Sequence, residues 1–332
     1  MPPSLSENVL AQLLVPRPLA PGIVDEYERP ASELVRPYTE LSAEPLASMV
    51  GIPFDTSILG RRGAKSGPEA VRWGINASLL YEPNLDIDLA EAPRVADYGD
   101  VDVYHTDVDR TWDRVSDVVA GLIGLGVPLL SIGGDHGLTY PILRGFCRAT
   151  RGKVGVILVD AHLDYRISHH GEKSSGVPFR YMLRDLGGQV SGRNFTEIGI
   201  GGWLNTKRYH SELIEQGVRI ITQRELRSGD FPALVREAIE RAAEGTDAIY
   251  LTFDIDAIDG AVAGATNVPA VGGLTPLQGL DIVFEFAQHP KAMAMDIMEV
   301  SPSWDHSTLT ERMAAALALN FFAGVYSRKL HG

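Results

Sequence analysis

The chain has 332 residues, 45% of them hydrophobic, so it can bury a core of the size expected for one large α/β domain. Its formal net charge of −13 argues against nucleic acid or an anionic membrane as a partner, because either would need a basic surface. A single cysteine, Cys147, excludes an internal disulfide and fits a reducing compartment. The sequence has no signal-peptide pattern at its start and no long uncharged apolar segment, so we expect a cytoplasmic protein.

Residues 1–45 carry many of the prolines and no sustained hydrophobic period. This stretch is therefore predicted to be an extended N-terminal arm that packs on its own body or on a neighbouring subunit. Residues 46–332 are predicted to form one domain.

Strands and helices alternate along this domain. Short apolar runs predict strands at 48–52, 94–98, 128–132, 154–159, 196–200, 219–222, 248–253 and 292–297. Helical periodicity and caps predict helices from Pro68, over 110–125, 140–149 and 232–243, from Thr275 and Pro276, and over 309–323. The alternation predicts a parallel sheet with helices on both faces.

The strand predicted at 154–159 runs directly into three potential metal ligands, Asp160, His162 and Asp164. If the chain stays extended there, side chains at a spacing of two leave the same side of the backbone and converge. Two carboxylates and an imidazole would suit a divalent manganese, nickel or zinc ion. The alternative is that the two aspartates only cap or turn the chain after the strand.

Three further strand ends carry acidic or imidazole side chains. His136 follows the glycine pair 133–134, Asp254 and Asp256 repeat the spacing of two, and Glu299 follows the last strand. Ligand sites in open α/β sheets lie at the edge formed by the carboxyl ends of the strands. Carboxylates gathered there would repel one another unless cations neutralised them. Two divalent ions about 3.5 to 4 Å apart could do so and share a water of lowered pKa, which indicates metal-assisted hydrolysis.

These motifs resemble the ureohydrolases, the arginase and agmatinase family. The resemblance rests on Gly-Pro-Glu-Ala-Val-Arg at 67–72, Gly-Gly-Asp-His at 133–136, Asp-Ala-His-Leu-Asp at 160–164, Phe-Asp-Ile-Asp-Ala-Ile-Asp at 253–259 and Glu-Val-Ser-Pro at 299–302. It covers the chain from about residue 48 onward and implies a three-layer α/β/α domain and a trimer or hexamer. It also implies two ions, usually Mn²⁺ and sometimes Ni²⁺, held by His136, Asp160, His162, Asp164, Asp254 and Asp256.

The resemblance further implies that Glu299 faces the nitrogen-rich group of the substrate, while Asp164 or a neighbouring acid relays a proton to the leaving amine. Ser175 occupies the place where guanidino-specific members have a histidine, and serine cannot perform a histidine's proton relay. Arg166 adds a fixed positive charge, which favours an anionic or neutral substrate unless it forms a structural salt bridge, for example to Asp185. Asn267 begins a stretch, 267–273, that resembles formimidoylglutamases, and it is a further candidate substrate contact.

The favoured substrate is therefore an N-formimidoyl-glutamate-like amidine that yields formamide. Glu-Val-Ser-Pro and residues 170–173, which resemble the agmatinase and guanidinobutyrase branch, keep open a guanidino hydrolase that releases urea from guanidinobutyrate, agmatine, free guanidine or a substituted guanidine. An alternative of another class is a noncatalytic subunit of a mixed oligomer, against which the complete ligand set argues. The glycine-rich fingerprint of dinucleotide binding is missing from the sequence.

Overall fold

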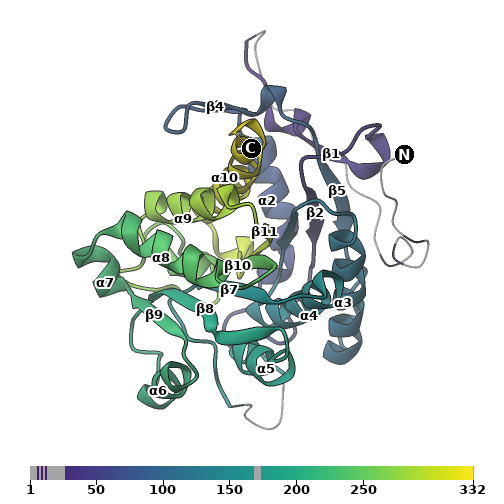
Figure 1. The fold of residues 1–332 in the computed structure, drawn as a ribbon. Coiled ribbons are helices and arrows are strands. Elements are labelled where there is room, and N and C mark those ends of the chain that lie inside the picture. Colours follow the sequence, from purple (N-terminus) through teal and green to yellow (C-terminus); the bar gives the residue numbers. More distant parts are fainter. Residues whose placement is uncertain (1–5, 7–8, 10–11, 13–26, 168–172, 332) are drawn as a thin grey trace.

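The computed structural model describes residues 6, 9, 12, 27–167 and 173–331. Within this part of the chain the main sheet has nine parallel strands in the order β1-β5-β2-β6-β11-β10-β7-β8-β9. Helices cover both faces of the sheet (Figure 1). The predicted three-layer α/β/α fold with a central parallel sheet is confirmed.

The strands of the main sheet are β1 (Val35–Pro37), β2 (Ser48–Gly51), β5 (Val95–Asp100), β6 (Leu129–Ile132), β7 (Val154–Val159), β8 (Val190–Ile200), β9 (Arg219–Thr222), β10 (Ala248–Asp254) and β11 (Ala292–Met298). Two short strands, β3 (Tyr81–Glu82) and β4 (Ile87–Asp88), form a separate antiparallel hairpin. Each strand expected from the apolar runs is present. β8 begins six residues earlier than predicted, because a polar first half, Ser191 to Asn194, breaks the apolar pattern.

The helices are α2 (Gly67–Asn76), α3 (Val108–Ile123), α4 (Thr139–Thr150), α5 (Pro178–Asp185), α6 (Lys207–Glu215), α7 (Gln223–Ser228), α8 (Phe231–Ala243), α9 (Pro276–Gln288) and α10 (Leu309–His331). The predicted start of α9 is correct, since Thr275 and Gln278 form a capping box and Pro276 occupies the first turn. The short helices α5, α6 and α7 were not predicted. Only one to three residues of each are buried, which leaves a weak hydrophobic period.

Two apolar cores lie on opposite faces of the sheet. One packs α2, α8, α9 and α10 against residues such as Leu251 and Ile297. The other packs α3, α4 and α5 against the alternate residues, such as Tyr250 and Met298, and it also encloses Cys147. This alternation along β10 and β11 decides which strand residues face α4, a point that matters for the site.

The predicted arm lies partly outside the described residues. Gln12 O accepts a hydrogen bond from Asp102 N at 3.2 Å, so the arm contacts its own body at that point. Val35–Pro37 forms β1, an edge strand that pairs with β5, and this strand was not predicted. A proline in an edge strand is tolerated, because its missing N–H can face away from the neighbouring strand.

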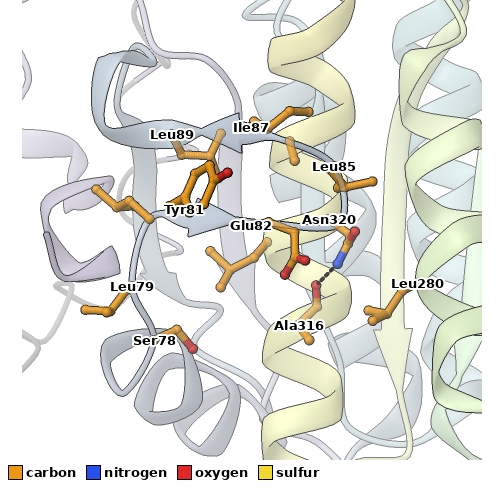
Figure 2. A pocket seen from close by; sticks show the side chains of 13 residues that line it. Ser78, Leu79, Tyr81, Glu82, Leu85, Ile87, Leu89, Leu280, Ala316 and Asn320 are labelled. Atoms are coloured by element: carbon orange, nitrogen blue, oxygen red, sulfur yellow. Dashed lines mark hydrogen bonds between the residues drawn. The ribbon is translucent and has the colours of Figure 1, made fainter. Parts of the chain in front are cut away.

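An apolar groove of about 300 Å³ lies between the β3–β4 hairpin and helices α9 and α10 (Figure 2). Leu85, Ile87, Leu280 and Leu319 contribute to its walls. The groove contains none of the predicted site residues. Among the described helices, none combines the length and apolar character that a bilayer crossing requires.

Candidate metal centre

The strand order explains why distant motifs meet. β6, β11, β10 and β7 are consecutive neighbours in the middle of the sheet, and all four are parallel. Their carboxyl ends therefore lie at one edge of the sheet. Asp254 ends β10, Asp160 and Glu299 directly follow β7 and β11, and His136 comes four residues after β6. The predicted gathering of these side chains at one strand-end site is what the structure shows.

A first cluster surrounds the imidazole of His136. Its Nδ1 lies 3.1 Å from one oxygen each of Asp160, Asp164 and Asp254. Donor atoms bound to one octahedral ion by bonds of about 2.1 Å are about 3 Å apart. The spacing within this cluster therefore suits ligands of a common ion.

A second cluster shares Asp160 with the first. His162 Nδ1 lies 3.4 Å from Asp160 Oδ1 and 3.1 Å from Asp256 Oδ2. The other oxygen of Asp160, Oδ2, belongs to the first cluster. One carboxylate thus joins two groups of potential ligands, and all six predicted metal ligands fall into these two groups.

The reason given for the convergence of Asp160, His162 and Asp164 was wrong in one respect. The chain does not stay extended after Val159, where β7 ends. Asp164 has a φ of +38°, in the left-handed region that side chains rarely adopt. His162 N donates to Asp160 Oδ1 at 2.6 Å, so the chain turns around the Asp160 carboxylate, and this turn directs the three side chains to one place.

Close backbone packing seats His136 and Glu299. A Cβ on Gly134 would lie 1.7 Å from Phe54 O, so only glycine fits there. Glu299 N donates to Gly134 O at 2.9 Å, and Glu299 Oε1 accepts from His136 N at 2.8 Å. Glu299 also has a positive φ, +66°. Its other oxygen, Oε2, is buried and has no hydrogen-bond partner among the described residues.

The two imidazoles face strong negative charge. Burial alone would lower the pKa of His136, but the carboxylates of Asp160, Asp164 and Asp254 raise it well above its ordinary value. For His162 the carboxylates of Asp256 and Asp160 likewise outweigh burial and raise the pKa to about 12. The same negative charge around both rings would favour a bound cation.

The carboxylates respond to the same crowding. Burial raises the pKa of Asp254 to about 6 and the charge of Asp160 adds to the shift. Burial, followed by neighbouring carboxylates, also raises the pKa of Asp164, Asp256 and Glu299. Asp160 is the exception, because the two imidazoles beside it outweigh burial and lower its pKa.

The donor set fits divalent ions. His136 Nδ1 and Asp160 Oδ2 are buried and have no well-directed hydrogen-bond partner in the described part of the chain. Buried polar atoms without partners are rare in folded proteins unless an ion or water completes them. Carboxylate oxygens mixed with imidazole nitrogens are ligands that suit manganese, nickel or zinc. The side chains of the two clusters thus provide the kinds of donor atom that divalent cations require.

Three of the four predicted substrate-binding residues lie beside a common segment, residues 57–60. Ser175 Oγ accepts from Leu59 N at 3.1 Å. A Cβ on Gly176 would lie within 3.0 Å of both the Arg166 stem and Leu59 Cδ1. A Cβ on Gly60 would lie 1.8 Å from Asn267 Oδ1. Ser175, Arg166 and Asn267 therefore all lie along segment 57–60.

Arg166 does not form the structural salt bridge considered for it. Its side chain is exposed and has no ion pair with a residue of the described ranges. Asp185 instead pairs with Arg184 at 2.6 Å and accepts from Tyr140 at 2.9 Å. Arg180 Nε donates to Arg166 O at 3.2 Å, so Arg180 holds the backbone at this point. Among the described residues, therefore, no carboxylate occupies the guanidinium of Arg166.

Sequence reasoning missed two buried acids beside the cluster. Both oxygens of Asp135 accept from Ser57, which ties segment 57–60 to the residue before His136. Burial raises the pKa of Asp135 to about 7, against the hydrogen bonds from Ser57. Glu197, in β8, is fully buried, and its oxygens have no partner among the described residues. The available signal for Glu197 was an acid within an otherwise apolar run at 195–200.

Comparisons with known proteins find relatives over most of this chain. The pattern of the arginase family matches residues 46–324. A formimidoylglutamase from Halalkalibacterium halodurans is 28% identical over 303 residues, covering 91% of this chain and 93% of that protein. The mitochondrial guanidino acid hydrolase of Homo sapiens is 34% identical over 272 residues, covering 82% of this chain and 76% of that protein.

Among solved structures, Trypanosoma cruzi formiminoglutamase with Mn²⁺ superimposes with a TM-score of 0.82. It is 24% identical, and the match covers 91% of this chain and 99% of that chain. At this identity the likeness supports the fold.

The family match and the relatives define a hydrolase of the class that acts on carbon–nitrogen bonds of linear amidines and guanidines. The chain belongs to the arginase family. The resemblance drawn from the sequence motifs is thereby confirmed.

Proposed function

We propose that the chain is a binuclear metal-dependent amidine hydrolase whose favoured substrate resembles N-formimidoyl-glutamate. The observation that carries the proposal is the pair of ligand clusters joined by Asp160. Six donor side chains exceed what one ion normally accepts without leaving carboxylates unpaired.

In this proposal His136, Asp160, Asp164 and Asp254 hold one ion, and Asp160, His162 and Asp256 hold the other. When bound, two such ions would lower the pKa of a bound water toward neutrality and so would supply a nucleophile at pH 7. We favour Mn²⁺, with Ni²⁺ as the alternative, because both accept mixed carboxylate and imidazole ligands.

The protein's own residues orient the substrate and move the proton. Glu299 Oε2 is buried and unpartnered among the described residues, so it can accept hydrogen bonds from the N–H groups of an amidinium. The Asp164 side chain is 14% exposed, against 4% for Asp254, so it faces the open side of the cluster. When water adds to the amidine carbon and the bond to the amine breaks, Asp164 relays the proton to the amine.

Arg166, Ser175 and Asn267 are proposed to bind the remainder of the substrate. The Arg166 guanidinium, which has no ion pair with a described residue, can hold a carboxylate through two parallel hydrogen bonds, as the glutamate moiety would offer. Ser175 already accepts from Leu59 N, so its hydroxyl hydrogen is free to be donated. Asn267 Oδ1 is buried and lacks a partner within the described ranges, so it can accept from a substrate N–H.

The second candidate is a guanidino hydrolase that releases urea from guanidinobutyrate, agmatine, free guanidine or a substituted guanidine. It is favoured by the 34% identity to the human guanidino acid hydrolase. Guanidinobutyrate also carries a carboxylate that Arg166 could hold. A noncatalytic role in a mixed oligomer is disfavoured, because a purely structural subunit would have no need of all six donors.

The remaining features stay predictions. We expect a cytoplasmic homo-oligomer, a trimer or hexamer, with an arm at 1–45 and a catalytic domain at 46–332. Light scattering on the purified protein would measure its size, and a monomer would contradict this expectation.

A substrate panel tests the proposed function. Protein loaded with Mn²⁺ or Ni²⁺ would be incubated with formimidoylglutamate, guanidinobutyrate, agmatine and guanidine, while formamide, urea and ammonia are quantified. We expect formamide from formimidoylglutamate as the fastest reaction. Urea from a guanidino compound at a higher kcat/KM would select the second candidate, and no product from any of the four compounds would overturn both.

A further inference from the structure

A continuous chain of hydrogen bonds lies behind His136, on the side away from the carboxylates. His136 Nε2 lies 3.0 Å from Thr252 Oγ1, and Thr252 Oγ1 lies 3.1 Å from Thr139 Oγ1. Thr139 Oγ1 then donates to Asp296 Oδ2 at 2.9 Å. The Tyr250 hydroxyl donates to the same Asp296 oxygen. All five side chains are buried.

The position of this chain follows from the strand register. Thr252 in β10 is directly paired with Asp296 in β11. Tyr250 lies two residues before Thr252 and so points to the same face, where α4 begins at Thr139. None of these four residues belongs to a ligand cluster, and the catalytic roles proposed above do not use them.

The hydrogen bonds between His136 and Asp296 all run in one direction, from donor to acceptor. An ionised carboxylate can only accept hydrogen bonds, and each threonine hydroxyl has one hydrogen to donate. If Asp296 accepts from Thr139, then Thr139 can accept from Thr252, and Thr252 can accept from the Nε2 hydrogen of His136. With its hydrogen held on Nε2, the ring presents the Nδ1 lone pair to the Asp160, Asp164 and Asp254 side of the site.

Because these side chains are buried, the loss of one hydrogen bond affects the others. The groups have no route to bulk water, so a broken link leaves a donor without an acceptor in the interior. The Thr252 hydroxyl has two acceptors on that side, Thr139 Oγ1 and the Asp296 carboxylate beside it. If Thr139 could not accept, Thr252 would lose one of them and would turn its hydroxyl hydrogen toward His136 Nε2 more often. The ring hydrogen would then favour Nδ1, where it would compete directly with a metal ion.

We propose that Thr252, Thr139 and Asp296 are positioning residues that fix His136 as an Nδ1 ligand through this chain of hydrogen bonds. The inference rests on the proposed function, because it concerns metal binding at the first cluster. Outer partners of metal-bound histidines commonly change metal affinity by about 10- to 100-fold. Here the partner is a carboxylate that acts through two hydroxyls.

Calorimetric titration of metal-free protein with Mn²⁺ would test the inference. Native protein should bind two ions per chain. Thr139→Val keeps the side-chain shape but removes the hydroxyl that joins Thr252 to Asp296. It should lower the affinity for one of the two ions about 10- to 100-fold. Thr139→Ser restores a hydroxyl and should restore the affinity. Thr252→Val, which removes the acceptor for Nε2, should weaken the same ion and serves if Thr139→Val fails to fold.

Thr196→Val is the matched control. Thr196 is a fully buried threonine of β8 whose hydroxyl has no partner among the described residues, so its loss should not change either affinity. Native affinity for both ions in Thr139→Val and in Thr252→Val, with only a lower melting temperature of the metal-free proteins, would show a purely structural network and overturn the inference. If native protein itself bound no Mn²⁺, the proposed function would fail instead.

Discussion

Asp254→Asn is expected to lower kcat/KM by about three orders of magnitude or more, while the metal-free chain folds at least as stably as the native one. Asp254 has an oxygen 3.1 Å from His136 Nδ1 in the first cluster, and an amide is a far poorer metal ligand than a carboxylate. Metal ions contribute several kcal/mol of transition-state stabilisation, and each 1.4 kcal/mol corresponds to about tenfold.

The stability part of this prediction has a definite pH dependence. In the folded metal-free protein the pKa of Asp254 is raised to about 6 from its ordinary 3.8, chiefly by burial. The folded state then binds more protons than the unfolded state between these values, so this group costs stability as the pH rises through the window. Asp254→Asn removes that cost, so its advantage over native protein should be present at pH 7 and disappear below about pH 4.

Thermal unfolding after chelation, combined with steady-state kinetics, measures both parts. Asp117→Asn is a suitable control, because it removes the same charge from an exposed acid of α3 that forms an ion pair with Arg148. It should leave activity unchanged. Near-native turnover by Asp254→Asn would remove Asp254 from the ligand set.

Arg166→Ala is expected to raise KM about tenfold for an anionic substrate and to change little for free guanidine. Each charge-assisted hydrogen bond is worth roughly 1.5 to 3 kcal/mol when water is excluded. Arg166 is exposed, so screening by water places the expected effect at the lower end of this range. Arg166→Lys should recover part of the loss, because it keeps the charge but not the two parallel bonds.

Kinetics with formimidoylglutamate, guanidinobutyrate and guanidine distinguish this role from a general one. Arg36→Ala provides the control, since Arg36 is an exposed arginine on the edge strand β1 that pairs with Glu40. An equal loss for all three substrates would contradict the carboxylate-binding role. So would a native enzyme that accepts guanidine but neither anionic compound.

The sequence predicted the parts of the site that follow strands. His136, Asp160, Asp254 and Glu299 each follow an apolar run, and parallel strands end at one edge whatever their order. The order itself, in which β6, β11, β10 and β7 are neighbours, depends on long-range pairing. It could not be derived from local pattern alone.

Two features of the site are visible only in the three-dimensional structure. The left-handed turn at Asp164 replaces the extended path that the spacing of two suggested, because the chain wraps the Asp160 carboxylate. The chain of hydrogen bonds from His136 to Asp296 depends on the strand register, since Thr252 lies opposite Asp296 only in the observed pairing of β10 and β11. An isolated threonine or a strand aspartate carries no such signal in the sequence.

Metal titration of the chelated enzyme, with bound metal and hydrolysis measured on the same samples, tests the binuclear proposal most directly. The two clusters that share Asp160 predict that activity rises steeply only as the second ion binds, and that elemental analysis of the fully active protein approaches two ions per chain. Full activity with one ion per chain, or activity that survives complete chelation, would contradict it.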